Sequence, residues 1–228
     1  MFHVKHFEEN YFMNNNNLLQ DTYFMWDLDG TLIDSYKVIV SSIKDVLNKH
    51  NLNVSYEIIK KEATEHSVGE FLTKVSKEYD LSFNELEKEC HSHIDSRYLE
   101  VEAIKNAKEI LDYLSKNGAK HFIYTHKGKS THDILKNLDI YQYFEEVLTI
   151  EDGFKRKPDP EAINYLVDKY NLNKNNTYYV GDRHLDIDSA NNAGVKSIFF
   201  KPEDSFIEPS GREDYVVYDL IEIKDIFK

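Results

Sequence analysis

The sequence predicts an α/β fold in which a parallel sheet carries helices on both faces and a helical segment is inserted near its start. Short apolar runs alternate with helical periods along most of the 228 residues, which is typical of strands joined by crossover helices. The stretch 36–103 differs, because it is helical in pattern and has no convincing buried strand. We therefore expect a sheet domain formed by 21–35 and 104–228, with 36–103 as a separate helical domain.

The first predicted strand is the apolar run 23–26, which stops at the polar sequence Asp27-Leu28-Asp29-Gly30. A short apolar run bounded by turn-forming residues is typical of a strand buried on both faces. Five later runs have the same character and are expected to complete the sheet, at 121–124, 147–150, 177–180, 197–200 and 215–218.

Helical periods separate these runs. Apolar residues recur every three or four positions in 104–114 and are followed by an Asn-Gly pair, a common C-terminal signal of helices. The same spacing in 163–170 predicts another helix, with Asp159 as its N-cap and Pro160 at its first position. Within the insertion we expect a first helix with its apolar face formed by residues 39–47, then helical segments at 56–65, 70–78 and 84–98.

Composition excludes several classes of protein. The 28 Lys and Arg against 41 Asp and Glu give a net charge of −13, which argues against a nucleic-acid partner. The single cysteine excludes an internal disulfide framework and a multi-cysteine zinc site. No apolar run approaches the roughly 18 residues that span a bilayer, and the N-terminus lacks a secretory signal. We expect a cytoplasmic globular protein without a membrane partner, with residues 1–20 as a disordered extension; the sequence does not predict an oligomeric state.

Four short motifs follow predicted strands or precede helices. Because parallel strands place their carboxyl ends at one edge of a sheet, we expect the motifs to converge there. Each alone also has a plain interpretation, as an Asx turn, a threonine that ends a strand, a solvated basic turn, and a helix N-cap formed by Asp186. The motifs are Asp27-Leu28-Asp29-Gly30-Thr31-Leu32, Thr125-His126-Lys127, Lys155-Arg156-Lys157-Pro158-Asp159-Pro160 and Gly181-Asp182-Arg183-His184-Leu185-Asp186.

Together the motifs predict a phosphate site with a metal ion. Four aspartates that converge would repel one another and take up protons unless a cation lay among them: Asp27, Asp29, Asp182 and Asp186. Mg²⁺ prefers such oxygen ligands and usually shares them with water and phosphate. Lys157 near a helix N-terminus and the hydroxyl of Thr125 would hold the oxygens of a phosphoryl group.

The ordered set DLDGT, THK, KRKPDP and GDRHLD resembles the haloacid dehalogenase superfamily, in the branch of phosphoglycolate phosphatase and β-phosphoglucomutase. The resemblance covers about residues 22 to 220 and implies a Rossmann-like core with the helical insertion as a cap that closes over the site and selects the substrate. It also implies a Mg²⁺-dependent phosphatase that acts on a small phosphomonoester, such as phosphoglycolate or a sugar phosphate. Candidate cap residues for substrate contact are His66, Lys74 and Arg97.

The resemblance also assigns roles to residues. Asp27 would be the nucleophile that forms an aspartyl phosphate, and Asp29 would protonate the leaving oxygen and then activate water. Thr125 and Lys157 would complete the catalytic set. The phosphate would be bound by Leu28, Asp29, Thr125, His126 and Lys157, and the metal by Asp27, Asp29, Asp182 and Asp186. His126 departs from the asparagine that is usual at its position.

Two alternatives remain open. A β-phosphoglucomutase-like phosphomutase would keep all four motifs, but such enzymes carry a hinge histidine roughly a dozen residues past the nucleophile. Here that stretch reads Ser35-Tyr36-Lys37-Val38-Ile39-Val40, and the next histidine is His50. A non-catalytic phosphate-binding or regulatory module is the second alternative, and it would be expected to have lost Asp27 or Asp29.

Overall fold

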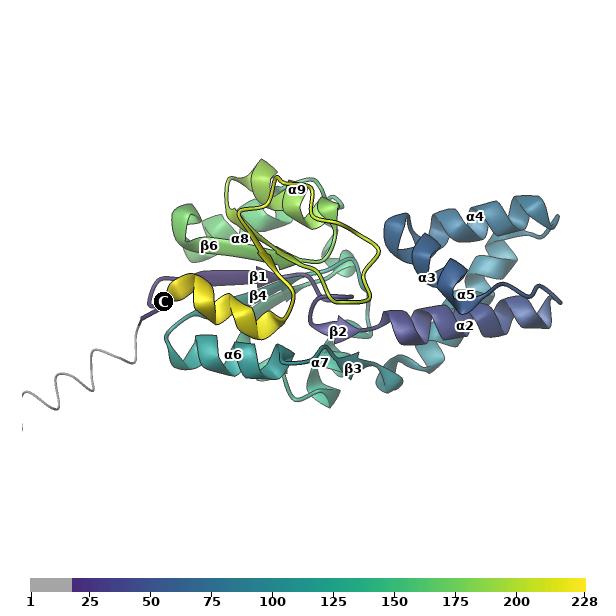
Figure 1. Ribbon diagram of the computed structural model, residues 1–228, viewed down its shortest axis with the longest axis horizontal. Coiled ribbons are helices and arrows are strands. Elements are labelled where there is room, and N and C mark those ends of the chain that lie inside the picture. The colour runs from purple at the N-terminus through teal and green to yellow at the C-terminus, as the bar shows by residue number, and fades with distance from the viewer. Residues whose placement is uncertain (1–17) are drawn as a thin grey trace, which may run out of the picture.

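The computed structural model describes residues 18–228, and its core is a parallel sheet with helices on both faces (Figure 1). The strand order is β5-β4-β1-β6-β7-β8, and every pairing in this sheet is parallel. The predicted fold class is confirmed. The strands are β1 Tyr23–Trp26, β4 Lys120–Tyr124, β5 Phe144–Leu148, β6 Thr177–Gly181, β7 Lys196–Phe200 and β8 Tyr215–Val217.

Burial on both faces explains why the strands are continuous apolar runs. Along β1, Phe24 and Trp26 point to one core and Met25 points to the other. The first core packs against α6 (Ala107–Lys116), α7 (Thr131–Asn137) and the C-terminal 3₁₀ helix η5 (Leu220–Phe227), and the second against α8 (Glu161–Tyr170) and α9 (His184–Ala193). The sheet is therefore packed on both faces where the loops after β1, β4 and β6 leave it.

The cap consists of four helices with a hydrophobic core of their own, which lies beyond one end of the sheet (Figure 1). Serine side chains accept hydrogen bonds at the N-termini of three of them, which fixes where these helices begin. Two short strands, β2 (Ile33–Asp34) and β3 (Glu102–Ala103), pair antiparallel where the chain enters and leaves the cap. The helices are α2 Tyr36–Lys49, α3 Tyr56–Glu65, α4 Val68–Glu78 and α5 Phe83–Ser96.

Several predicted boundaries are wrong. The strand expected at 147–150 is β5 at Phe144–Leu148, because Thr149 and Asp152 form a capping box that starts a 3₁₀ turn. Pro160 is the N-cap of α8 rather than its first residue. Residues 1–17 of the predicted extension 1–20 lie outside the part of the chain that the structure describes. Leu19 is buried in the core and donates its N–H to the Asn117 carbonyl at 2.9 Å, so core contacts begin earlier than expected.

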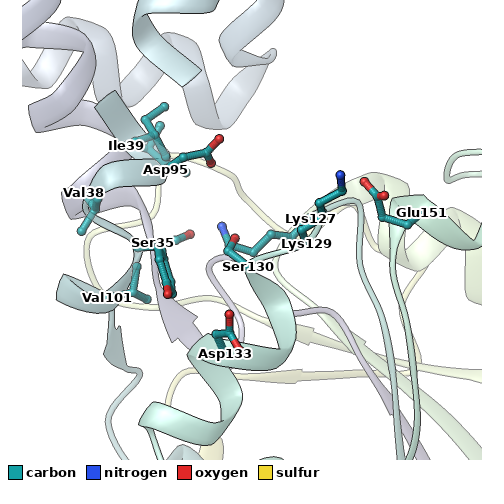
Figure 2. Close-up of a pocket in the computed structure, with 13 residues that line it drawn as sticks. Ser35, Val38, Ile39, Asp95, Val101, Lys127, Lys129, Ser130, Asp133 and Glu151 are labelled. Carbon is teal, nitrogen blue, oxygen red and sulfur yellow. The ribbon is translucent and has the colours of Figure 1, made fainter. Parts of the chain in front are cut away.

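A cavity of about 500 Å³ lies between the cap and the sheet (Figure 2). One wall comes from the start of α2 and from α5, and includes Ser35 and Asp95. The other comes from the loop after β4 and the start of α7, and includes Lys127 and Lys129. The cavity thus reaches the edge where the four motifs were expected to meet. Within residues 18–228, no helix combines the length and apolarity that crossing a membrane requires.

Candidate active site

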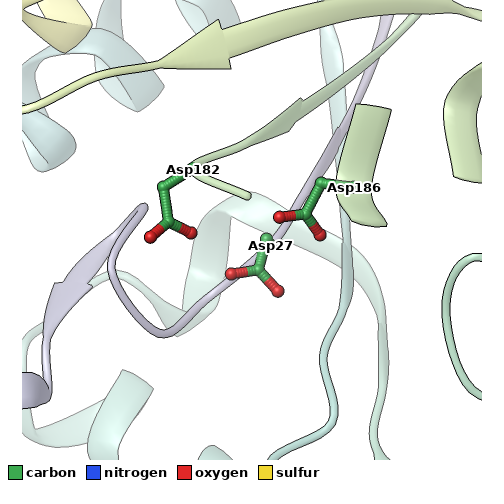
Figure 3. Close-up of side chains that lie close together, drawn as sticks. All are labelled: Asp27, Asp182 and Asp186. Atoms are coloured by element: carbon green, nitrogen blue, oxygen red, sulfur yellow. The ribbon is translucent and has the colours of Figure 1, made fainter. Parts of the chain in front are cut away.

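Three buried carboxylates meet at the carboxyl edge of the sheet (Figure 3). Asp27 directly follows β1, Asp182 directly follows β6, and Asp186 lies in the first turn of α9. One oxygen of each carboxylate lies within 4.8 Å of an oxygen of the other two. The structure therefore brings together three of the four aspartates that were expected to converge.

Two glycines make room for these carboxylates. Gly30 has φ +88°, and a Cβ at this position would lie 2.9 Å from Cγ of Asp182. A Cβ at Gly181 would lie 2.6 Å from Oδ2 of Asp186. Contacts this short are not compatible with a side chain unless the carboxylates move, so the glycines allow the backbone to approach the acids closely.

Lys157 lies between two of the acids. Its Nζ is 2.5 Å from Oδ1 of Asp27 and 2.8 Å from Oδ1 of Asp186, and its side chain is 1% exposed. The aromatic rings of Tyr124 and Tyr179 flank the ammonium, with centroids 5.0 and 5.2 Å away. Burial lowers the pKa of Lys157, but the charges of Asp186 and Asp27 outweigh it and hold that pKa well above its ordinary value. The amine is therefore a fixed positive charge.

One lysine does not balance three acids. Burial is the main reason that the pKa of Asp27 is raised to about 7, although Lys157 opposes it. Burial, with the charges of Asp27 and Asp186, raises the pKa of Asp182 well above its ordinary value. Protons or a further cation must therefore compensate the cluster near neutral pH. Buried, clustered carboxylate oxygens are the donor set that hard divalent cations prefer, so the residues present fit such an ion.

Asp29 lies apart from the three buried acids and has a different partner. Its Oδ1 is 2.9 Å from Nζ of Lys127, and the side chains of Asp29 and Lys127 are 27% and 13% exposed. The hydroxyl of Thr125 accepts the Lys127 N–H at 3.1 Å, which ties the loop after β4 to this pair. The sequence alone indicates no role for Lys127, although it is the last residue of the THK motif.

His126 contacts the protein backbone in this structure. Its Nε2 accepts the N–H of Lys157 at 3.0 Å. Burial, together with the charges of Lys157 and Arg156, lowers the pKa of His126 to about 4, so the ring is neutral at pH 7. The ring therefore positions the backbone of Lys157, while its phosphate contact stays a prediction. Leu28 has a buried apolar side chain, so only its backbone could contact a phosphate.

Two of the three cap residues considered for substrate contact, Lys74 and Arg97, have acidic side-chain partners. Lys74 pairs with Glu62 at 2.5 Å, and Arg97 binds Glu100 with Nη2 at 2.8 Å. The backbone carbonyl of His66 accepts a hydrogen bond from Arg183. In the part of the chain that the structure describes, none of the three candidates lines the cavity between the cap and the sheet.

Comparison with known proteins identifies the family of this chain. The haloacid dehalogenase-like hydrolase family matches residues 24–200. The pyrophosphatase PpaX of Bacillus mycoides (strain KBAB4) is 31% identical over 177 residues, which cover 76% of this chain and 80% of that protein. The pyrophosphatase PpaX of Oceanobacillus iheyensis is 28% identical over 208 residues, which cover 89% of this chain and 93% of that protein.

Solved structures share the fold. A candidate phosphatase from Clostridium difficile superposes with a TM-score of 0.75 and 30% identity, over 92% of this chain and 99% of that one. A haloacid dehalogenase family hydrolase from Deinococcus radiodurans, with bound phosphate and sodium, gives a TM-score of 0.77 over 92% of this chain and 96% of that one. At 16% identity, the second likeness supports the fold alone. The chain therefore belongs to the haloacid dehalogenase-like hydrolase family and is a phosphatase.

Proposed function

We propose that this phosphatase uses Mg²⁺ to hydrolyse a small phosphorylated metabolite in the cytoplasm, and that Asp27 becomes phosphorylated during the reaction. The observation that carries the proposal is the position of the Asp27 carboxylate, which is buried at the end of the central strand between Lys157 and Asp182. A nucleophile in this position is held in place by the sheet, and positive charge is already beside it.

The residues suggest a reaction in two steps. Lys157 holds Oδ1 of Asp27, which leaves the other oxygen to attack phosphorus. The new O–P bond forms as the bond from phosphorus to the leaving oxygen breaks, and Asp29 gives that oxygen a proton. Asp29 then takes a proton from a water molecule that attacks the aspartyl phosphate, which releases phosphate and restores Asp27. Thr125 and Lys157 would contact the phosphoryl oxygens.

The proposed ligands of Mg²⁺ are the carboxylates of Asp27 and Asp182 and the backbone carbonyl of Asp29. A bound divalent ion would neutralise the acids and so permit a phosphate dianion to come near them. Asp186 has both oxygens engaged, Oδ1 with Lys157 and Oδ2 with the N–H of Arg183 at 3.1 Å. These contacts favour an orienting role for Asp186 over direct ligation.

Pyrophosphate and phosphoglycolate are the first substrates to test. Pyrophosphate is suggested by the names of the PpaX relatives, and phosphoglycolate by the resemblance of the four motifs. The mutase alternative is less favoured, because His50 does not stand where a hinge histidine would. His50 is the C-cap of α2, and its Nε2 lies 3.1 Å from Oε2 of Glu89. Within the described chain, no histidine belongs to α2 itself.

The test is phosphate release by the purified full chain. We expect turnover of pyrophosphate, phosphoglycolate or a sugar monophosphate with Mg²⁺, none with EDTA, and recovery when Mg²⁺ is returned. Asp27→Asn should abolish turnover while the circular dichroism spectrum is kept, and Asp112→Asn on the surface of α6 should leave turnover intact. Activity in Asp27→Asn would refute the nucleophile. An isomerised sugar phosphate without free phosphate would indicate a mutase, and a folded protein without any product a non-catalytic module.

A further inference from the structure

Lys127 contacts both the proposed acid and base Asp29 and the cavity between the cap and the sheet. On one side its ammonium pairs with Asp29, the proposed acid and base, at 2.9 Å. On the other side the same residue lines the cavity between the cap and the sheet. Its side chain is only 13% exposed, so any group that enters the cavity beside Asp29 meets this charge with little screening by solvent. Lys127 therefore links Asp29 to the cavity.

The same cavity contains polar groups without a protein partner. Ser35 is 1% exposed, and its hydroxyl has no hydrogen-bond partner in the described chain. Lys129 also lines the cavity and forms no ion pair within residues 18–228. Figure 2 shows Lys129 reaching from the loop after β4 toward the side of Ser35. A buried hydroxyl without a partner is costly, so Ser35 points to a polar ligand in this cavity, and the exposed Lys129 adds positive charge beside it.

Acidic residues limit the size of that ligand. Asp95, Asp133 and Glu151 line the cavity, and Figure 2 shows them around the two lysines. All three are exposed, whereas Lys127 and Ser35 are at least partly buried. Solvent screens the outer acids more than it screens the inner lysine, so the attraction for an anion is confined to the space near Lys127. A compact anionic group fits this pattern, and a long polyanion does not.

We propose that Lys127 exchanges partners during substrate binding and thereby selects the substrate. In the free enzyme it holds Asp29; in the complex it binds a second compact anion, a phosphoryl or carboxylate group on the leaving-group side. This inference rests on the proposed function, because it assigns the leaving group to the cavity. The exchange keeps the charge of Lys127 paired in both states, and it turns the Asp29 carboxylate toward the leaving oxygen only when such a group is bound.

Two matched pairs of substrates test the exchange. Phosphoglycolate is compared with ethyl phosphate, and pyrophosphate with methyl phosphate, so that each pair differs in the second anion. We expect Lys127→Met to lower kcat/KM for the members with two anions by about 10- to 100-fold more than for their partners. Lys127→Arg should recover most of that difference, because it keeps the charge. Ser35→Ala should raise KM for the same two substrates, while Lys77→Met on the surface of α4 serves as the control.

The outcomes separate this inference from the proposed function. Equal losses for both members of each pair in Lys127→Met would mean that Lys127 acts only on Asp29, and would overturn the inference. Hydrolysis of sugar phosphates but of neither substrate with two anions would also overturn it, with the proposed function intact. A wild-type protein without activity on any phosphorylated compound would overturn both. Circular dichroism of each variant shows whether its loss comes from misfolding, and Lys127→Arg and Ser35→Ala keep the test open if Lys127→Met does not fold.

Discussion

Lys157 connects the stability of the protein to its chemistry at the scale of single residues. Its ammonium is shared between Asp27 and Asp186, both of which are buried. Without it, two carboxylates would remain in the interior with no ion-pair partner among residues 18–228. Removing one member of such a buried group is strongly destabilising, because the remaining charges lose their compensation.

We therefore expect Lys157→Met to lose phosphatase activity and to lower the free energy of unfolding by about 3 to 5 kcal/mol in EDTA. Urea denaturation measures this change. Lys155→Met is the matched control, since that side chain is 69% exposed and its pairing with Asp159 at 3.6 Å contributes less than about 1 kcal/mol. Equal effects of the two substitutions would contradict the structural role assigned to Lys157.

Spacing in the sequence predicts some residues of the site and not others. Asp27, Asp182 and Lys157 stand directly after strands or before a helix, so parallel-sheet geometry alone brings them to one edge. The rings of Tyr124 and Tyr179 beside Lys157 belong to strands, where apolar and aromatic residues are expected for packing. Their contact with an ammonium depends on how distant segments face each other, which a local pattern does not contain.

The loops after β1 and β6 determine the site at the scale of elements. Each begins with an acid and contains or follows a glycine whose missing side chain leaves space for a carboxylate. At Gly181 the neighbour is Asp186 of α9, so the end of β6 and the start of α9 are pressed together. Any side chain there would separate the strand from the helix and move the carboxylate.

Gly181→Ala should thus lower the free energy of unfolding by about 1 to 3 kcal/mol and also reduce activity, since the added methyl group displaces Asp186. Gly69→Ala is the matched control. Gly69 lies in α4, and a methyl group added there would have no atom within 4 Å, so alanine should stabilise the protein by about 0.5 to 1 kcal/mol. Thermal denaturation and phosphate release measure both variants. A Gly181→Ala protein with unchanged stability and activity would contradict the close packing of β6 on α9.

The sequence predicts long elements better than short ones. The helices of the cap follow from apolar spacing, and α3 begins and ends at the predicted residues. The two-residue strands β2 and β3 could not be predicted, because each exists only through its pairing with the other across the whole insertion. The error in β5 has a local cause, since the Thr149 side chain caps a turn at a position that reads as part of a strand.

At the scale of the whole molecule, the acid cluster makes folding depend on pH and on metal. The folded-state pKa of Asp27 is raised to about 7, above its ordinary value of 3.8, mainly by burial. A raised folded pKa gives stability that is complete below the unfolded pKa and is lost as the pH rises through the folded pKa. In EDTA, the ionisation of Asp27 therefore makes the free energy of unfolding fall as the pH rises from about 4 to about 7. The raised pKa of Asp182 acts in the same direction.

We expect the Tm in EDTA to fall less steeply between pH 4.5 and pH 8 in Asp27→Asn than in the wild type, as measured by calorimetry. The difference between the two proteins is the informative quantity, because His121 acts in the opposite direction in both. Burial lowers the pKa of His121 to about 3, so it contributes stability above its unfolded pKa that is lost as the pH falls. Identical slopes in the two proteins would contradict the raised pKa of Asp27.

Mg²⁺ should reverse this loss. At pH 8, a concentration about 100 times the dissociation constant should raise the free energy of unfolding by about 2.7 kcal/mol, because the ion binds only the folded state. Asp182→Asn should abolish most of the increase, and Asp112→Asn should keep it. An increase of the same size in Asp182→Asn would place the ion elsewhere.

The antiparallel pair β2–β3 has a consequence for how such enzymes diversify. The chain leaves the sheet domain and returns to it through hydrogen-bonded neighbours, and Lys37 binds an acid on each strand, Asp34 at 2.8 Å and Glu102 at 3.3 Å. The two ends of the insertion are consequently held together by β2 and β3, and this pairing does not involve the inserted helices. We expect this junction to let the helices beyond it be replaced as a unit, with the reaction centre on the sheet left in place.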